Sequence, residues 1–449
     1  MNPQMFREYD IRGIAGKDMD EEDVFRIGQG VGTYLRQSDC RRVVVGRDCR
    51  LTSDAYVEKV MAGLQAAGCD VTDIGICPTP VLYFSIEHFN MEGGVMVTAS
   101  HNPGRYNGFK LCKGSDSIHG SQILEIRDII DAGDFASGKG DRSTADAISP
   151  YQAFLKENIE LSKLLRIGVD AGNGTAGVVA VPALRAHGCE VHDIYCDMDG
   201  TFPNHEADPT VLKNMTDLIA MVKEKKLDVG IGYDGDGDRI GVVDENGHII
   251  YGDKLLIIFA REILSRRPGA TFISEVKCSQ TMYDDIEKHG GRAIMWKTGH
   301  SLIKKKMKEE NAALAGEMSG HMFFADRYFG FDDATYASLR LLEILSRTDQ
   351  PLSALLADVP ETFTTPEIRV ECPDDKKFDV VERITAHFKK DYDVIDIDGM
   401  RVLFGDGWGL VRASNTQPAL VLRFEALSED RLNEIRALVE NTLSDIRNS

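Results

Sequence analysis

Three aspartates at alternate positions are the strongest candidates for chemistry in this sequence. The stretch DVGIGYDGDGDRIGVV at 228–243 carries Asp234, Asp236 and Asp238, with a glycine between each pair. Glycine lets the backbone turn tightly, so these carboxylates can converge on one hard cation. Ligands from a single loop leave positions open on an octahedral Mg²⁺, which fills them with phosphate or water oxygens. The loop therefore predicts a magnesium site with an anionic partner.

Two other interpretations of this loop compete with the magnesium site. An EF-hand would explain why Glu245 stands at the twelfth position counted from Asp234. However, the sixth position is Arg239, where an EF-hand needs glycine, and the flanking segments are patterned as strands. A solvated acidic turn would leave the glycines unexplained, and carboxylates packed beside apolar strands are costly unless a cation balances them. We therefore favour the metal site.

A serine in a strand-to-turn segment is the second candidate. VMVTASHNPGRYNGFK, at 95–110, has an apolar strand pattern, then a polar turn that contains Ser100, and ends on Lys110. Pro103 stops the chain from continuing as a helix, which presents the serine hydroxyl at a loop tip. For an isolated match a plain turn is the better interpretation. Beside a metal loop, however, a seryl phosphate on Mg²⁺ is a phosphoryl donor.

The segment GEMSGH at 316–321 could hold a sugar. Its Glu317, Ser319 and His321 stand at alternate positions, which predicts that they share one side of an extended loop. A carboxylate and a hydroxyl suit neighbouring sugar hydroxyls, and a histidine can move a proton near neutral pH. A glutamate without such a partner would simply be solvated.

The segment RASNTQP at 412–418 could hold a phosphate. It follows a strand pattern and offers a set of donors with no acidic side chain among them: Arg412, Ser414, Asn415 and Thr416. A guanidinium fork, hydroxyls and backbone N–H groups together suit a phosphate dianion.

The composition of the chain limits its partners. The length of 449 residues suggests roughly three or four domains. The formal charge of −20, with a pI near 5.0, argues against a nucleic-acid partner. Any site for an anion must therefore be local and basic. The basic candidates are Arg7, Arg12, Lys277, Lys297, the lysines at 304–306 and Arg412.

Membrane insertion and disulfides are not expected. The longest apolar runs, such as LLIIFA at 255–260, fall far short of the ~20 residues that span a bilayer. The start, MNPQMFREYDIRG, has no signal-peptide pattern, so we expect a cytoplasmic protein. The nine cysteines form no C-x-x-C pair and lie next to apolar patterns, as at Cys77, Cys112 and Cys278, which indicates reduced core residues.

One structural plan recurs three times along the chain. Each copy has an apolar strand, a polar turn, an amphipathic helix that ends at a glycine, and a second strand, at 42–75, 166–195 and 271–299. The helix-ending glycines are Gly68, Gly188 and Gly290, where a left-handed cap is favourable. Alternating strands and helices predict α/β units with largely parallel pairing.

The pattern changes after about residue 360. Short strands separated by glycine turns follow one another and predict antiparallel pairing, with a final helix from about Glu429 to Ile446. We therefore expect four domains, at 1–145, 146–248, 249–360 and 361–449.

These motifs, in this order, resemble those of the α-D-phosphohexomutase superfamily, and most closely its bacterial phosphomannomutase/phosphoglucomutase branch. The resemblance covers nearly the whole chain and includes FREYDIRG, TASHNP, DGDGDR, the run MWKTGHSLIKKKMKEENAALAGEMSGH, and RASNTQPALVLRFEA. It implies three similar mixed α/β sandwich domains and a C-terminal α+β domain of the TATA-binding-protein type, around a central cleft. Because a reaction intermediate that turns round must be held in two orientations, we expect the fourth domain to be mobile, with a hinge near residue 360. Gln417 departs from the commonest form of the phosphate loop, and Met318 stands where the phosphoglucosamine mutase branch usually has glutamine.

The resemblance also implies roles for individual residues. Ser100 would carry the transferred phosphate, and Asp234, Asp236 and Asp238 would hold one Mg²⁺ together with an oxygen of that phosphate. Sugar hydroxyls would bind Glu317 and Ser319, and the non-reacting phosphate would bind Arg412, Ser414, Asn415 and Thr416. The remaining cleft residues would be Tyr9, Arg12, Lys110, Arg239, Lys277, His300 and His321, of which Arg12, Lys110, Arg239 and His321 are the catalytic candidates besides Ser100.

The implied activity is the interconversion of 6-phosphohexoses and 1-phosphohexoses of mannose and glucose through a 1,6-bisphosphohexose, which would also serve as activator. We expect a hexose phosphate as the partner, no nucleic acid or membrane, and a monomer or weak homo-oligomer. Two alternatives stay open: a phosphoglucosamine mutase, and a non-catalytic protein that binds metal and phosphate and whose serine is a regulatory site.

Overall fold

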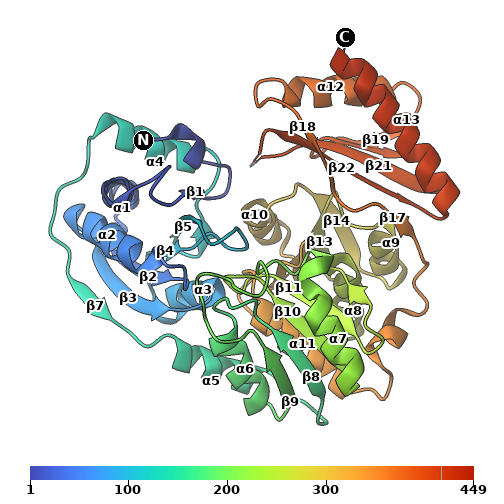
Figure 1. The fold of residues 1–449 in the computed structure, drawn as a ribbon, viewed down its shortest axis with the longest axis horizontal. Helices are drawn as coiled ribbons and strands as arrows, with labels where there is room; N and C mark the ends of the chain where they lie inside the picture. The colour runs from blue at the N-terminus through green and yellow to red at the C-terminus, as the bar shows by residue number, and fades with distance from the viewer. Residues whose placement is uncertain (416, 449) are drawn as a thin grey trace.

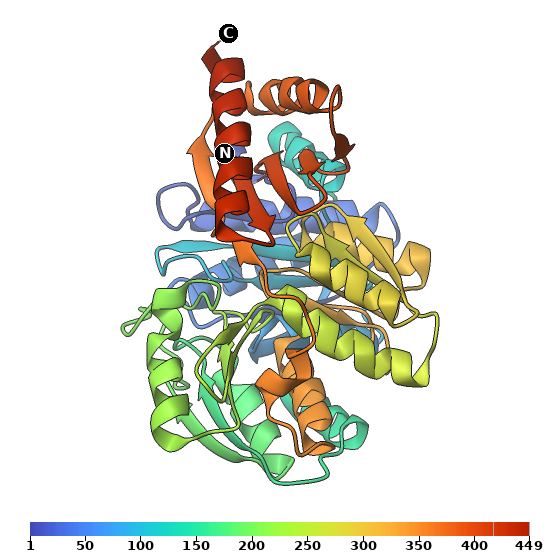
Figure 2. The same cartoon turned by 90° about the vertical axis from the view of Figure 1, so that its right-hand side faces the viewer.

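The computed structural model describes residues 1–415 and 417–448 and contains four sheets, each with its own helices. We name the parts unit I (η1 to β7), unit II (α5 to β12), unit III (α8 to η3) and unit IV (β17 to α13). Figures 1 and 2 show the units arranged in chain order around a common centre, with unit IV projecting from the others. The mixed α/β architecture expected from the sequence is confirmed.

Unit I is built on a seven-stranded sheet in the order β1-β5-β4-β2-β3-β7, with β6 paired to β5. Its elements are η1 (Pro3–Met5), β1 (Ile11–Ile14), α1 (Glu21–Arg36), β2 (Arg42–Arg47), α2 (Ser53–Ala66), β3 (Asp70–Ile76), α3 (Thr79–His88), β4 (Gly93–Val97), β5 (Tyr106–Lys113), β6 (Asp116–Ser117), α4 (Ser121–Ala132) and β7 (Arg142–Thr144).

Units II and III have smaller sheets, in the orders β12-β11-β10-β8-β9 and β14-β13-β15-β16. The elements of unit II are α5 (Ile148–Asn158), β8 (Arg166–Asp170), α6 (Gly177–Ala186), β9 (Glu190–Ile194), η2 (Leu212–Met215), α7 (Thr216–Lys225), β10 (Val229–Tyr233), β11 (Ile240–Asp244) and β12 (Ile249–Ile250). Those of unit III are α8 (Gly252–Arg266), β13 (Thr271–Glu275), α9 (Gln280–Lys288), β14 (Arg292–Trp296), α10 (His300–Glu310), β15 (Leu314–Gly316), β16 (Met322–Phe324), α11 (Ala334–Ser346) and η3 (Leu352–Leu356).

Unit IV is a sheet in the order β17-β22-β21-β20-β19, with β18 paired to β22, and all its pairs are antiparallel as the sequence predicts. Its elements are β17 (Phe363–Thr364), β18 (Ile368–Glu371), α12 (Lys377–Phe388), β19 (Asp393–Ile395), β20 (Met400–Leu403), β21 (Gly407–Ala413), β22 (Ala419–Ala426) and α13 (Glu429–Asn448).

The threefold repeat is confirmed. The strand pairs β2/β3, β8/β9 and β13/β14 are parallel and joined by one helix each. Gly68, Gly188 and Gly290, which follow those helices, have φ values of +87°, +87° and +81°. This is the left-handed conformation in which glycine caps a helix.

The repeat extends further than the sequence pattern indicates. In each unit another strand pairs in parallel with the first one (β4 with β2, β10 with β8, β15 with β13), and the next strand of the chain returns antiparallel to it. The three turns β4–β5, β10–β11 and β15–β16 therefore occupy equivalent places. They contain the motifs TASHNP, DGDGDR and GEMSGH, respectively. The fold thus presents three predicted loops at the same kind of sheet edge.

One apolar cluster spans units I to III, beside further clusters within each of them, whereas unit IV packs in a cluster of its own. A single cluster of buried side chains runs from Val44 in unit I through Ile167 in unit II to Phe272 in unit III. In unit IV, alternate residues of β22 such as Leu422 and Phe424 pack against α12 and α13 in a separate cluster. A small cluster of Val276, Trp408 and Leu410 joins unit IV to unit III.

The cysteines, the aspartate loop and the end of the second sheet can be compared with the sequence predictions. All nine cysteines are free; six of them, including Cys77, Cys112 and Cys278, are buried as expected, whereas Cys40, Cys49 and Cys196 are half-buried. The strands β10 and β11 flank the aspartate loop, in agreement with the argument against an EF-hand. Strand β12 lies just beyond residue 248, so the second sheet continues slightly past the expected boundary. Within the described residues, no helix has the length and apolarity that crossing a membrane would require.

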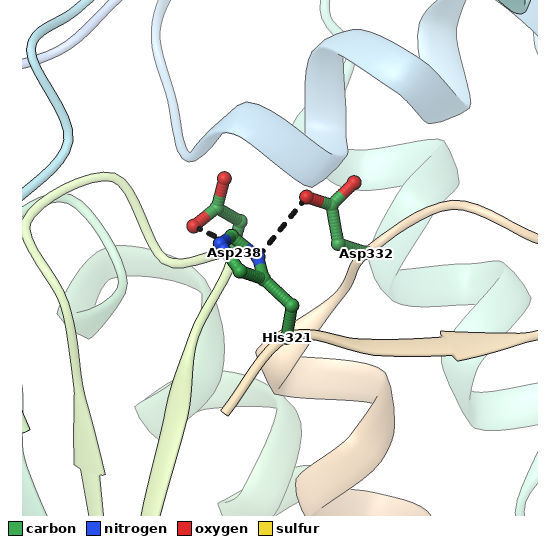
Figure 3. A group of neighbouring side chains, drawn as sticks. All are labelled: Asp238, His321 and Asp332. Atoms are coloured by element: carbon green, nitrogen blue, oxygen red, sulfur yellow. Dashed lines mark ion pairs between the residues drawn. The ribbon is translucent and has the colours of Figure 1, made fainter. Parts of the chain in front are cut away.

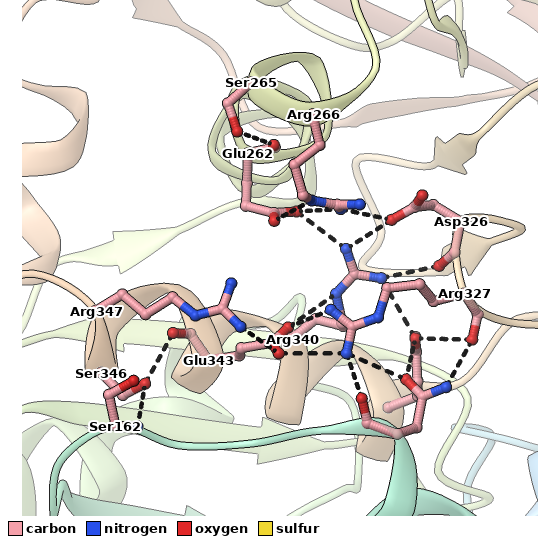
Figure 4. A network of polar contacts seen from close by, with 12 residues as sticks. Ser162, Glu262, Ser265, Arg266, Asp326, Arg327, Arg340, Glu343, Ser346 and Arg347 are labelled. Atoms are coloured by element: carbon pink, nitrogen blue, oxygen red, sulfur yellow. Dashed lines mark hydrogen bonds and ion pairs between the residues drawn. The ribbon is translucent and has the colours of Figure 1, made fainter.

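A buried ionic network secures unit III (Figure 4). The side chain of Arg340, in α11, is 1% exposed and lies among three carboxylates, at 3.1 Å from Glu262, 3.1 Å from Asp326 and 3.7 Å from Glu343. Arg327 bonds Glu343 at 2.8 Å and also donates to the carbonyl of Asn158, at the end of α5. Arg340 therefore balances the buried carboxylates of unit III, and Arg327 ties the same network to unit II.

We expect Arg340→Leu to destabilise the protein strongly, because it leaves buried carboxylates without their central cation. The free energy of unfolding should fall by about 3–5 kcal/mol, seen as a lower melting temperature of the transition of units I to III in calorimetry. Arg436→Leu, which breaks an exposed pair with Glu440 on α13, should change it by less than about 0.5 kcal/mol. Equal shifts for the two variants would contradict the assigned role of Arg340.

Candidate functional site

Ser100 lies in the β4–β5 turn with its hydroxyl against the aspartate loop of unit II. Its Oγ donates to Oδ2 of Asp234 at 2.8 Å and lies 3.1 Å from Nδ1 of His101. The residue is 2% exposed and has a φ of +51°, in the left-handed region that residues other than glycine seldom adopt. Gly235 explains how closely the loops approach, because a Cβ there would stand 2.5 Å from the carbonyl oxygen of Ser100.

The three aspartates are completely buried and converge. Asp234, Asp236 and Asp238 have carboxylate oxygens within 4.8 Å of one another. Lys110 Nζ donates to Asp236 Oδ2 at 2.6 Å and also to Asp238. Thr79, at the start of α3, donates to the same oxygen of Asp236 at 2.6 Å. Two elements of unit I therefore hold the loop of unit II.

The pKa values of these carboxyls reflect their burial and the closeness of three negative charges. Burial, together with the neighbouring Asp238 and Asp236, raises the pKa of Asp234 well above its usual value. Burial and Asp236 likewise raise the pKa of Asp238. Burial opposes ionisation of Asp236 as well, but Lys110 outweighs it and lowers the pKa of this carboxyl. Lys110 and the nearby Arg239 bring two positive charges against three carboxylates, so the loop favours further positive charge.

The residues present fit a hard divalent cation. Among the described residues, the buried oxygens Asp236 Oδ1 and Asp238 Oδ1 have no hydrogen-bond partner. Buried carboxylate oxygens without donors are costly unless a cation takes them, and an all-oxygen donor set is the one that Mg²⁺ prefers. Asp234, Asp236 and Asp238 are the residues that would hold it.

A second buried group contains Asp238, His321 and Asp332, of which the sequence predicted the first two and missed Asp332 (Figure 3). Arg239 Nε donates to His321 Nε2 at 2.9 Å, which assigns the ring hydrogen of a neutral imidazole to Nδ1. That Nδ1 lies 3.1 Å from Asp332 Oδ2 and 3.6 Å from Asp238 Oδ1. Burial raises the pKa of Asp332, but Lys304 at 3.1 Å prevails and holds it well below the usual range. Asp332 therefore stays ionised and orients His321.

A cavity of about 800 Å³ opens in front of these loops. Most of the predicted site residues line it: Tyr9, Arg12, Ser100, Lys110, Arg239, Lys277, His300, Glu317, Ser319 and His321. Arg7, one of the basic candidates, also lines it. Although the chain is strongly acidic, its cavity gathers cationic side chains from units I, II and III.

The lysine run at 304–306 is not part of this cavity, in contrast to the expectation for a basic anion site. Lys304 is buried against Asp332, and Lys306 pairs with Glu310 at 2.7 Å within α10. Lys297 is also missing from the described residues that line the cavity. Because a helix turns 100° per residue, consecutive lysines cannot all face one ligand.

The GEMSGH segment is a tight turn and not the extended loop that alternation predicts. Glu317 N donates to the carbonyl of His321 at 2.9 Å, and Gly320 closes the turn with a φ of +94°. Glu317, Ser319 and His321 nevertheless all line the cavity. Glu317 Oε1 also accepts from Gly299 N at 2.7 Å, so one oxygen supports the neighbouring loop.

The predicted phosphate loop of unit IV lies next to unit I. Asn415 Nδ2 donates to the hydroxyl of Tyr9 at 2.8 Å, and this hydroxyl donates to the carbonyl of Thr298 at 2.7 Å. Arg412 Nε donates at 2.9 Å to Asp398, which also accepts from Thr298 N at 3.0 Å. Arg412, Ser414 and Asn415 are not among the described residues that line the cavity. Thr416 lies outside the described residues.

Several site residues carry no signal that a single sequence could supply. Asp332 follows no motif, and Thr79 and Asp398 become relevant only through contacts distant in the chain. His101 stands next to Ser100 in TASHNP and could have been found there. Burial lowers the pKa of His101 well below its usual value, with Arg239 and Arg12 acting in the same direction, so its ring is neutral.

We expect Asp236→Asn to weaken divalent-metal binding. Removing one carboxylate charge from a three-carboxylate site should raise the Kd for Mn²⁺, used as a spectroscopic probe for Mg²⁺, by at least about tenfold. Electron paramagnetic resonance titration measures it. Asp208→Asn, at the rim of the cavity, is the matched control and should leave the Kd unchanged. Equal Kd values for Asp236→Asn and the unaltered protein would exclude the aspartate loop as the metal site.

Four family models match this chain. Their descriptions are phosphoglucomutase/phosphomannomutase alpha/beta/alpha domain I, domain II, domain III and C-terminal domain, and they match residues 3–137, 149–247, 251–363 and 367–442.

Relatives and a solved structure agree with these matches. A phosphomannomutase/phosphoglucomutase of Pseudomonas putida is 46% identical over 98% of this chain and 95% of its own length. A phosphoglucomutase of Neisseria meningitidis is 42% identical over 97% of each chain. The crystal structure of a phosphoglucomutase/phosphomannomutase family protein from Burkholderia thailandensis superposes with a TM-score of 0.94 at 42% identity, covering 100% of this chain and 98% of that one.

Proposed function

Because this chain belongs to the phosphoglucomutase/phosphomannomutase family, we propose that it interconverts hexose 6-phosphates and hexose 1-phosphates, with mannose and glucose both accepted. The observation that carries the proposal is the 2.8 Å contact between the Ser100 hydroxyl and Asp234 of the aspartate loop, at the base of a basic cavity. A hydroxyl that can carry a phosphoryl group stands beside the residues that would hold Mg²⁺.

The reaction uses Ser100 as donor and acceptor in turn. A hexose 1,6-bisphosphate first supplies the phosphoryl group of Ser100. The bond between Ser100 Oγ and phosphorus then breaks while the free sugar hydroxyl oxygen bonds to phosphorus, and the proton of that hydroxyl passes to a base in the cavity. The product is a 1,6-bisphosphohexose, which turns end for end. The reverse transfer from its other end regenerates phosphorylated Ser100.

The protein supplies charge and position. Mg²⁺ would neutralise the charge that develops on the transferring phosphoryl group. Lys110, Arg12 and Arg239 add cationic donors around the same place, since all of them line the cavity. Lys110, Arg12 and His321 are the candidates for moving the hydroxyl proton, as general base and general acid.

Sugar recognition is assigned to the turn of unit III. Glu317 and Ser319 line the cavity next to His300, and we propose that they bind the O3 and O4 hydroxyls. These contacts then do not distinguish the configuration at C2, the carbon at which mannose and glucose differ. A shared set of contacts at O3 and O4 accounts for the use of both sugars.

Unit IV is proposed to bind the non-reacting phosphate and to move. Arg412, Ser414 and Asn415, with Lys277 of unit III and Thr416 of the same loop, would grip it. The separate core of unit IV and its small apolar contact with unit III favour a hinge near residue 360. The four parts with boundaries at 145, 248 and 360 would then each contribute one loop to the reaction.

We expect Ser100→Ala to lose turnover but to keep substrate binding. Without Oγ no phosphoryl carrier exists, so kcat on glucose 1-phosphate should fall by more than about 10³-fold, with a Kd for glucose 6-phosphate within about threefold of normal by calorimetry. Ser85→Ala, a buried serine of α3, is the matched control and should keep its kcat. A near-normal kcat for Ser100→Ala would refute the proposal, and inactivity of the unaltered protein on hexose phosphates would favour the non-catalytic alternative.

We expect Arg412→Ala to act mainly on KM. Its phosphate contact would be made in both ground and transition states, so KM should rise by about 10- to 100-fold while kcat falls less than about threefold. Steady-state kinetics with glucose 1-phosphate measures both constants. Arg431→Ala removes an arginine of unit IV that pairs with Asp406 away from the cavity and should change neither. A loss confined to kcat would contradict the assigned role of Arg412.

A further inference from the structure

Arg50 lies behind the loop that carries Ser100, and every N–H of its guanidinium has an acceptor. The residue is 3% exposed, and the described residues that line the cavity do not include it. Its Nε donates to Asp48 Oδ2 at 2.9 Å. The Nη atoms donate to four carbonyl oxygens of one loop, those of Ser100 (2.7 Å), Asn102 (2.6 Å), Pro103 (2.8 Å) and Tyr106 (3.1 Å).

These carbonyls need a donor of this shape. Four carbonyls, three in the turn between β4 and β5 and that of Tyr106 at the start of β5, accept from this one guanidinium, in buried or part-buried surroundings where a carbonyl needs a donor. A guanidinium presents five N–H groups in one plane with fixed directions, and the loop wraps around them. An ammonium has three donors on one nitrogen and cannot reach four carbonyls spread along the chain.

Arg50 is itself fixed from two sides. Asp48 accepts from Arg50 N at 3.0 Å and from the hydroxyl of Ser53, so its carboxylate is anchored. The ring of Phe202, in unit II, has its centroid 5.1 Å from Cζ of Arg50, within the range of a cation–π contact. The guanidinium is therefore held between the serine loop and the neighbouring unit and does not depend on Ser100 for its place.

The conformation of Ser100 depends on this clamp. Ser100 has a φ of +51°, which costs free energy for any residue with a Cβ and persists where the surroundings over-determine it. Its carbonyl oxygen accepts from Arg50 Nη2 and lies close to Gly235, where a Cβ would be only 2.5 Å away. Because the same residue makes the Oγ bond to Asp234, a carbonyl held by Arg50 restricts where Oγ can lie.

We propose that Arg50 is a positioning residue for phosphoryl transfer: it holds the main chain of residues 100–106 so that the oxygen of Ser100 keeps its place at the aspartate loop, with or without phosphate. The inference rests on the proposed function, because it concerns the same serine. Arg50 acts through backbone carbonyls and not on the phosphoryl group, which separates it from Arg12, Lys110 and Arg239 in the cavity.

The test compares Arg50→Lys with Arg340→Lys, a charge-preserving change at the other buried arginine described above (Figure 4). Both should lower the melting temperature. Only Arg50→Lys should lower kcat on glucose 1-phosphate, by about 100-fold for a displacement near 1 Å, with KM within about threefold. Hydrogen exchange followed by mass spectrometry should show faster exchange in the peptide 98–107 for this variant alone.

Asp48→Asn is the second variant, in case Arg50→Lys does not fold. It leaves the carbonyl bonds of Arg50 but weakens their anchor, so an intermediate loss of kcat with faster exchange at 98–107 is expected. Normal kcat and exchange in the folded Arg50→Lys, or in Asp48→Asn if only that variant folds, would overturn the positioning role. Failure of the proposed function is distinguishable, because the unaltered protein would then have no mutase activity while the exchange comparison would still report on the loop.

Discussion

The convergence of three buried carboxylates is the constraint on which the centre of this molecule depends. Asp234, Asp236 and Asp238 are fully buried within a few ångströms of one another, and burial together with their mutual repulsion raises the pKa values of Asp234 and Asp238. Such a loop is stable only if cations and donors surround it. Lys110 and Thr79 of unit I supply part of this environment, and the unpartnered oxygens leave room for a metal. The site is therefore built by interfaces between units and not within one unit.

The repeated topology explains how those interfaces arise. In units I to III a parallel strand is followed by an antiparallel return, and the turn between them carries the functional motif. Arranging three such units around one centre brings a serine turn, an aspartate turn and a glutamate–histidine turn together. A common apolar core keeps these three turns in fixed relation. Rigid support suits phosphoryl transfer, in which positioning and charge stabilisation are most of the catalysis.

Much of the fold and the centre of the site could be predicted, because they are encoded in local patterns. Strand and helix periodicity gave the repeats, and glycine-spaced aspartates indicated the metal loop. Residues whose roles depend on distant contacts could not be predicted. Asp332 matters because His321 and Lys304 face it, and Arg50 because four carbonyls turn towards it. The lysine run at 304–306 suggested a basic anion site, but helix geometry separates consecutive side chains. Alternation in GEMSGH suggested an extended loop, but Gly320 permits a turn.

Unit IV, in the proposed mechanism, has to release and rebind the non-reacting phosphate. An intermediate with phosphates at both ends must be held in two orientations, so the grip on the non-reacting phosphate has to loosen without disturbing Ser100 or the aspartates. Unit IV has its own core and joins unit III through the cluster of Val276, Trp408 and Leu410 and through the buried Arg401, which donates to the carbonyls of Val276 and Cys278. In the proposed mechanism this unit moves as a body while units I to III stay packed. The bond from Asn415 to Tyr9 joins the predicted phosphate loop to unit I through half-buried side chains. Such a contact breaks and reforms at little cost in free energy, whereas the clamp of Arg50 on the serine loop is buried and stays closed. The proposed mechanism therefore combines a fixed phosphoryl carrier with a movable phosphate grip.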